Sequence, residues 1–98
     1  MCTSIIEIIE ADGMAQRGDA WFGLDRAVVA YDHARHALLG DAITLDFVNM
    51  ALDPSARTGV ELTLESARAL RAALDRAITA AEREEREERG HRSLARAA

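Results

Sequence analysis

The chain opens with a short run in which isoleucines stand on both faces of a predicted strand. Residues 3–10 read Thr-Ser-Ile-Ile-Glu-Ile-Ile-Glu, and this β-branched composition favours a strand over a short helix. Because side chains alternate along a strand, Ile5 and Ile9 face away from Ile6 and Ile8. We therefore expect the first strand to be apolar on both faces.

Further strands follow along the first two thirds of the chain. Residues 11–19, with two Gly and two Asp, are expected to form a loop. Residues 32–41 are expected to connect the second and third strands. A continuous apolar run and two stretches of strict alternation predict three strands, near residues 24–31, 43–47 and 60–64.

The period of the apolar positions changes from 2 to 3.6 after the fourth strand. A single stripe at helical spacing comprises Ala67, Leu70, Leu74, Ala77, Ile78 and Ala81. This stripe predicts a helix from Leu64 to Arg89, with Gly90 as its stop. The pattern therefore predicts an α+β fold, in which a four-stranded antiparallel meander is followed by one long C-terminal helix packed on one face.

The predicted helix is longer than the sheet that would support it. A helix from Leu64 to Arg89 spans roughly 39 Å, whereas strands of this kind span roughly 23 Å. We therefore expect a compact domain over residues 1–81 and a charged helical extension and tail over residues 82–98, with a partner-binding arm as the alternative. Acid–arginine pairs at i, i+4 would support the extension: Glu82–Arg86, Glu85–Arg89 and Glu88–Arg92.

Composition narrows the class of protein. A length of 98 residues fits one domain, and a hydrophobic fraction of 49% excludes a wholly disordered chain. The lone cysteine excludes an intramolecular disulfide framework and suits a reducing compartment. No signal sequence precedes the first isoleucines, and no apolar run approaches the ~20 residues that span a bilayer. We expect a cytoplasmic protein that does not enter the membrane.

The net charge of −5 is unevenly distributed. Residues 1–65 hold 11 acidic side chains and 4 Arg, a net of −7, whereas residues 66–98 hold 6 acidic side chains and 8 Arg, a net of +2. The Arg residues of the helix alternate with Glu, which would repel phosphates, and 4% aromatic residues make a poor base-stacking platform. We therefore expect no nucleic-acid partner.

One polar cluster could carry chemistry. His33 and His36, three residues apart in the predicted connection, could converge on one transition metal such as zinc or iron. Asp32 could orient one imidazole from behind, and Cys2 or Asp46 could complete the ligand set. The alternative is that both histidines are exposed on a hairpin connection without a ligand.

Enzymatic signatures are otherwise missing from the sequence. There is no glycine-rich nucleotide motif, phosphate-binding loop or nucleophile elbow. A Cys2–His dyad could support nucleophilic chemistry, but nothing in the sequence brings the two residues together. We expect a protein that is not an enzyme.

Five short motifs follow one another along the chain: Met1-Cys2-Thr3, Trp21-Phe22, Tyr31-Asp32-His33-x-x-His36-Ala37, Asp46-Phe47-Val48-Asn49 and Glu61-Leu62-Thr63-x-Glu65-Ser66-Ala67-Arg68. Together they resemble a family of small actinobacterial proteins of unknown function. The resemblance covers residues 1 to about 80 and implies a single compact domain in a bacterial cytoplasm, without any activity. The family often has Pro after the first His of the pair, where this chain has Ala34.

Two functional hypotheses follow from the sequence. The first is a small metal-binding protein with His33 and His36 as ligands and with Cys2 or Asp32 completing or supporting the site. The second is a non-catalytic accessory or interaction module that forms a homo-oligomer through the sheet. It depends on the first two strands, which are apolar on both faces, while a single helix can cover only one.

Overall fold

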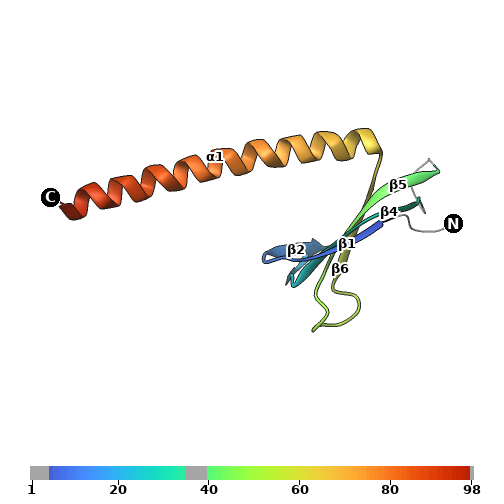
Figure 1. Ribbon diagram of the computed structural model, residues 1–98. Helices are drawn as coiled ribbons and strands as arrows, with labels where there is room; N and C mark the ends of the chain where they lie inside the picture. The colour runs from blue at the N-terminus through green and yellow to red at the C-terminus, as the bar shows by residue number, and fades with distance from the viewer. Residues whose placement is uncertain (1–4, 35–39, 98) are drawn as a thin grey trace. The chain divides into compact units, whose positions relative to one another are not determined.

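The chain folds into an antiparallel sheet, a short hairpin and one long C-terminal helix, which confirms the α+β class (Figure 1). The computed structural model describes residues 5–34 and 40–97, with side chains through His91. The elements are β1 (Ile5–Glu10), β2 (Met14–Arg17), β3 (Ala20–Gly23), β4 (Arg26–His33), β5 (Asp41–Val48), β6 (Arg57–Leu62) and α1 (Leu64–Ala97).

The main sheet has the order β1-β4-β5-β6, and every neighbouring pair is antiparallel. This is the predicted four-stranded meander, with the β2–β3 hairpin inserted between its first and second strands. The second strand runs two residues further than predicted, so His33 is its last residue rather than part of the connection. In the register of β4 and β5, His33 lies opposite Asp41.

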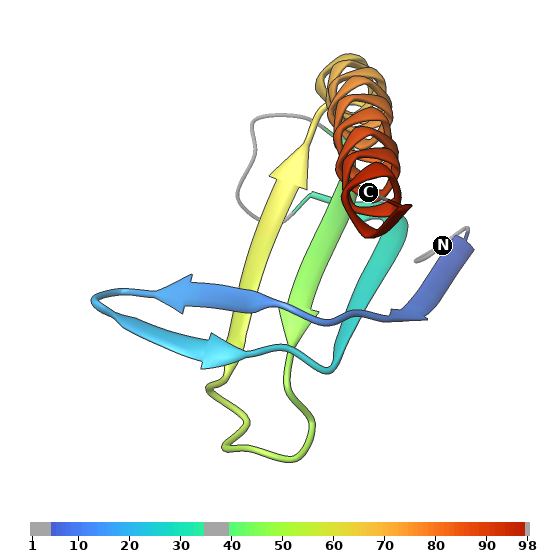
Figure 2. The ribbon, with the colours of Figure 1, turned by 90° about the vertical axis from the view of Figure 1, so that its left-hand side faces the viewer.

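The prediction of a loop over residues 11–19 is wrong for β2, which pairs with β3 as a hairpin. Arg17 pairs with Ala20 across a two-residue turn, and Gly18 has φ +61° at its first position. Glycine takes this conformation without steric cost, and a Gly-x pair suits a tight hairpin turn. The hairpin runs crosswise to the main sheet (Figure 2), where Thr58 Oγ1 donates a hydrogen bond to the Gln16 carbonyl at 2.8 Å.

The two faces of the main sheet differ in chemistry. Paired residues share a face and successive residues alternate, so the registers assign every strand position. The face that carries Val28, called here the Val28 face, mixes Ile6 and Ile8 with charged Arg26, Asp46 and Arg57. The opposite face, called the Val29 face, is mainly apolar, and its polar strand residues are Glu7, His33, Asp41 and Thr58. The other strand residues of this face are Ile5, Ile9, Ala27, Val29, Tyr31, Ile43, Leu45, Phe47, Val60 and Leu62.

Little of this apolar surface is buried. Among the described residues, the buried hydrophobic side chains are Ala27, Ala30 and Ala42. Larger side chains of the two central strands, such as Val29 and Leu45, are only half-buried. Most of the sheet's larger hydrophobic side chains are therefore in contact with solvent.

The chain divides into two units, Met1–Glu65 and Ser66–Ala98. The helix continues through Gly90 to Ala97, so the predicted stop at Gly90 is wrong. Gly90 lacks a positive φ, and a glycine inside a helix costs only about 1 kcal/mol, which helix-forming residues on both sides offset. The ion pair Glu85–Arg89 is present, with 4.0 Å between Oε2 and Nη2.

Two statements about the helix stay predictions. The sheet unit and the helix are each described by themselves, so packing of α1 on one face of the sheet remains an expectation from its apolar stripe. The boundary between a compact domain and an extension at residue 81 likewise remains a prediction. Within residues 5–34 and 40–97, no helix has the length and apolar composition to cross a bilayer.

Candidate functional site

Three polar side chains gather where β4 ends and β5 begins, on the Val29 face. The Nδ1 atom of His33 lies 3.0 Å from Asp41 Oδ1. The hydroxyl of Tyr31 donates to the other carboxylate oxygen, Asp41 Oδ2, at 3.4 Å. The antiparallel register explains the cluster, because it sets His33 opposite Asp41 and Tyr31 one pair further along the same face. All three side chains are at least 40% exposed.

The contact with the Asp41 carboxylate bears on which nitrogen of the His33 ring can bind a ligand. A neutral imidazole whose Nδ1–H donates to a carboxylate carries its lone pair on Nε2. Carboxylate–histidine pairs of this kind hold metal-ligating imidazoles in orientation and increase their basicity. The arrangement is therefore compatible with a metal ligand at Nε2.

Asp32 does not lie behind the imidazole of His33, where the sequence analysis predicted it could orient the ring. Neighbouring residues of a strand point to opposite faces, so Asp32 lies on the Val28 face and His33 on the Val29 face. Asp32 Oδ1 accepts a hydrogen bond from the backbone N–H of His33 at 2.7 Å. The carboxylate that the structure sets against the imidazole is that of Asp41, which the sequence reasoning did not single out.

Of the remaining predicted ligands, the structure describes only Asp46. Cys2 and His36 lie outside the described residues. Asp46 is on the Val28 face, five strand positions from Asp41, so it cannot join His33. Within the described residues, no group of three or more His, Cys, Asp or Glu side chains is arranged to hold a metal ion.

A second feature lies on the Val28 face, where the connection from β5 to β6 borders a hollow of about 450 Å³. Its lining is mainly apolar: Ile8, Val28, Val48, Met50, Leu52 and Pro54. Charged side chains at the same hollow include Arg26, Asp46 and Arg57. Hollows of this size can admit a small molecule.

The charged side of the hollow is built by Asp46, Arg57 and Gly59. Arg57 Nε donates to Asp46 Oδ1 at 2.9 Å, and the Asp46 side chain is 24% exposed. Gly59 pairs with Asp46 across β5 and β6, and a Cβ on Gly59 would meet the same oxygen at 2.8 Å. The glycine thus leaves the space in which the ion pair forms.

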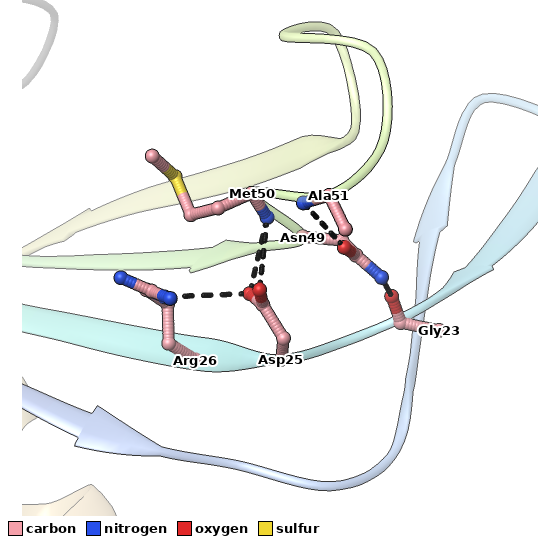
Figure 3. A network of polar contacts seen from close by, with 6 residues as sticks. All are labelled: Gly23, Asp25, Arg26, Asn49, Met50 and Ala51. Carbon is pink, nitrogen blue, oxygen red and sulfur yellow. Dashed lines mark hydrogen bonds and ion pairs between the residues drawn. The ribbon is translucent and has the colours of Figure 1, made fainter.

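A polar network fixes the connection between β5 and β6 at its start (Figure 3). Asn49 Nδ2 donates to the Gly23 carbonyl at 2.6 Å, while Asn49 Oδ1 accepts the Ala51 N–H at 2.9 Å. Both carboxylate oxygens of Asp25 accept the Met50 N–H at 3.1 Å. The Asp-Phe-Val-Asn motif therefore supplies two structural side chains, Asp46 to the ion pair and Asn49 to the network.

The same connection contains a turn held by Asp53. Asp53 Oδ1 accepts the Ser55 N–H at 2.8 Å. This backbone hydrogen bond is the largest of the effects that lower the pKa of Asp53, with smaller lowering from the Ser55 side chain and from Arg17. The ionised carboxylate therefore stabilises the predicted Asp-Pro-Ser turn.

A family of unknown function, DUF6295, matches residues 1–87. The chain belongs to the DUF6295 family. The match confirms the sequence-level resemblance to a small family of unknown function and extends seven residues beyond its expected limit near residue 80. The comparisons with curated proteins and with solved structures found no match.

Membership in DUF6295 supplies no activity, so a functional argument depends on the described residues themselves. The family match spans β1 to β6 and the part of α1 that carries the apolar stripe. Three features of the described residues could serve a function: the exposed apolar sheet, the His33–Asp41–Tyr31 cluster and the hollow on the Val28 face.

Proposed function

We propose that this DUF6295 protein is a non-catalytic interaction module that self-associates through its sheet. The observation that carries the proposal is the exposure of β1. All four of its isoleucines, Ile5, Ile6, Ile8 and Ile9, are 53–63% exposed. They stand on both faces of one strand at the end of the sheet.

The small buried core supports the proposal. Removing apolar surface from water is the main driving force of folding and of most protein association. Among the described residues, three alanines are the only buried hydrophobic side chains. Most of the apolar surface of the sheet unit is therefore exposed and can still be buried by association. A single helix can cover only one face, and the isoleucines of β1 occupy both. A second copy of the chain offers matching apolar surface.

Paired substitutions in β1 test the proposal. Replacing Ile6 and Ile8 together with Thr keeps β-branched residues on the strand but removes apolar surface. We expect the apparent dissociation constant of the oligomer, measured by light scattering over a concentration series, to rise at least tenfold. Met14→Thr is the control, because Met14 is 60% exposed but lies on the β2–β3 hairpin, outside the main sheet. An unchanged dissociation constant in the β1 variant would count against association through the sheet.

We propose metal binding as a second candidate function, supported by the contact between His33 Nδ1 and Asp41. In this proposal His33 binds zinc or iron through Nε2, with Asp41 as its carboxylate partner. His36, on the connection between β4 and β5, is the second ligand. Cys2 stands three residues before Ile5, which pairs with Tyr31 at the same end of the sheet. Cys2 completes the site, and Asp32 supports it through the hydrogen bond that it accepts from the His33 backbone N–H.

Metal analysis of untagged protein tests this second candidate. We expect a stoichiometric transition metal in the wild-type chain and its loss after His33→Ala or His36→Ala. His91→Ala is the control, because His91 lies on α1. A wild-type chain that takes up no metal from zinc or ferrous solutions would refute the candidate.

For both candidate functions we propose a bacterial cytoplasmic location, because a lone cysteine suits a reducing compartment.

A further inference from the structure

Among the described residues, the outer side of β1 has no strand partner. β1 pairs with β4 on one side and is the end strand of the sheet among the described residues. End strands present N–H and C=O groups that can pair with another chain. Natural sheets protect such edges with prolines, inward charges or bulges. β1 has no proline and pairs with β4 without a bulge, and its one charge between the isoleucines is Glu7, which lies on the Val29 face.

The sequence of β1 is a palindrome about Glu7. It reads Ile5-Ile6-Glu7-Ile8-Ile9, so the same residue type occurs at equal distances on either side of the glutamate. In an antiparallel pair of identical strands, a two-fold axis through Glu7 sets Ile5 opposite Ile9 and Ile6 opposite Ile8 of the second copy. Cross-strand pairs of β-branched residues are favourable on either face of a sheet.

We infer that two copies of the chain join edge to edge through β1, antiparallel and in register about Glu7. This inference rests on the proposed self-association and specifies its partner and its contact. The two four-stranded sheets become one continuous sheet across the two-fold axis. The Val29 faces of both copies lie on the same side of it, because an axis perpendicular to a sheet preserves its faces.

The available area agrees with a weak dimer. Each isoleucine of β1 is more than half exposed, which leaves on the order of 100 Å² of each residue in contact with solvent. Because side chains stand perpendicular to a sheet, edge-to-edge pairing covers only the flank of each isoleucine that faces the second copy. The buried area therefore stays below the ~1,000 Å² of a typical specific interface, and the pairing depends mainly on its backbone hydrogen bonds. We therefore expect dissociation on dilution in the micromolar range.

Repulsion between the two copies of Glu7 is expected to weaken the pairing. Within residues 5–9, the register brings one pair of like charges face to face, Glu7 of each copy. Like charges directly opposite each other destabilise a strand pair. Glu7→Gln, which keeps the size of the side chain, is therefore expected to tighten the dimer roughly twofold to fivefold. Association through another surface gives no such gain.

Cysteine cross-linking tests the register directly. In a Cys2→Ser background, Glu7→Cys places the two thiols of a dimer opposite each other, within the Cα separation that a disulfide allows. Ile9→Cys in the same background is the control, because its two thiols would lie roughly 13 Å apart along the strands. Under copper–phenanthroline oxidation at micromolar protein, we expect the Glu7→Cys chain to cross-link at least tenfold faster than the Ile9→Cys chain.

Every other outcome overturns the inference. The outcomes also distinguish failure of the β1 pairing from failure of the proposed self-association. Equal or faster cross-linking of the Ile9→Cys chain refutes the register. A wild-type chain that dimerises by light scattering, with no cross-link at Glu7→Cys and no tightening by Glu7→Gln, refutes β1 pairing but leaves self-association in place. A wild-type chain that stays monomeric over the micromolar range refutes both. Circular dichroism of each cysteine variant verifies that it folds.

Discussion

Gly59 lies directly opposite Asp46 in the ladder of β5 and β6, and a Cβ added to Gly59 would come within 2.8 Å of Asp46 Oδ1. The same oxygen accepts the hydrogen bond from Arg57 Nε at 2.9 Å. A missing side chain on one strand therefore creates the room for an ion pair between its neighbours. This relationship connects the glycine of β6 to the charged side of the hollow.

Gly59→Ala is expected to destabilise the fold by about 1–2 kcal/mol, because the new methyl group displaces the Asp46 carboxylate. Urea denaturation at a fixed protein concentration measures the effect. In an Asp46→Ala background the same change is expected to be neutral or stabilising, since alanine has less conformational freedom to lose than glycine. Equal costs in both backgrounds would show that Asp46 is not what excludes a side chain at residue 59.

Asn49→Ala is expected to cost about 1–2 kcal/mol of unfolding free energy. The change removes the hydrogen bonds of Asn49 to the Gly23 carbonyl and to the Ala51 N–H. Met50→Ala serves as the control, because Met50 is 66% exposed and its backbone contact with Asp25 is retained. The same denaturation experiment compares the two. If Asn49→Ala costs no more than Met50→Ala, the network of Figure 3 does not stabilise the connection.

The turn at Asp53 is expected to loosen in acid. Because hydrogen bonding to Ser55 lowers the pKa of Asp53 in the folded chain, the ionised form favours the folded turn. Its contribution is complete above the pKa of the unfolded chain and is lost as the pH falls through the lowered folded value. A carboxyl-carbon NMR titration should give Asp53 a midpoint below the ordinary aspartate value of about 3.9. A midpoint at or above that value would contradict the turn.

Gly90→Ala is expected to stabilise α1 by about 0.5–1 kcal/mol. Gly90 lies inside the helix without a positive φ, and an added Cβ would meet nothing within 4 Å. Alanine has the higher helix propensity, so far-ultraviolet circular dichroism should detect increased helicity in the full chain. Reduced helicity would instead indicate that Gly90 caps the helix in solution, as the sequence pattern alone suggested.

The main sheet could be predicted from the sequence because its strands carry strong periodic signals. The alternation of Ile43, Leu45 and Phe47 is one example, and the isoleucines of β1 are another. The β2–β3 hairpin was not predicted, since its strands are short and alternate weakly. Gly18-Asp19 was the signal that could have revealed it, as a two-residue turn of the Gly-x type.

The candidate site could be predicted only in part. His33 was identified, but the carboxylate beside it depends on the β4–β5 register, which sets His33 opposite Asp41 rather than Asp32. The predicted second strand ends two residues before β4 does, so the pairing of His33 with Asp41 could not be predicted. The Asp46–Arg57 pair was hidden for the same reason, because cross-strand partners are defined by register and not by sequence distance.

The most direct test of self-association through the sheet is the molar mass of the untagged wild-type chain by sedimentation equilibrium over the micromolar range. We predict a mass that rises with concentration from the 10.7 kDa of one chain toward twice that value. A mass that stays at 10.7 kDa throughout the range would contradict it.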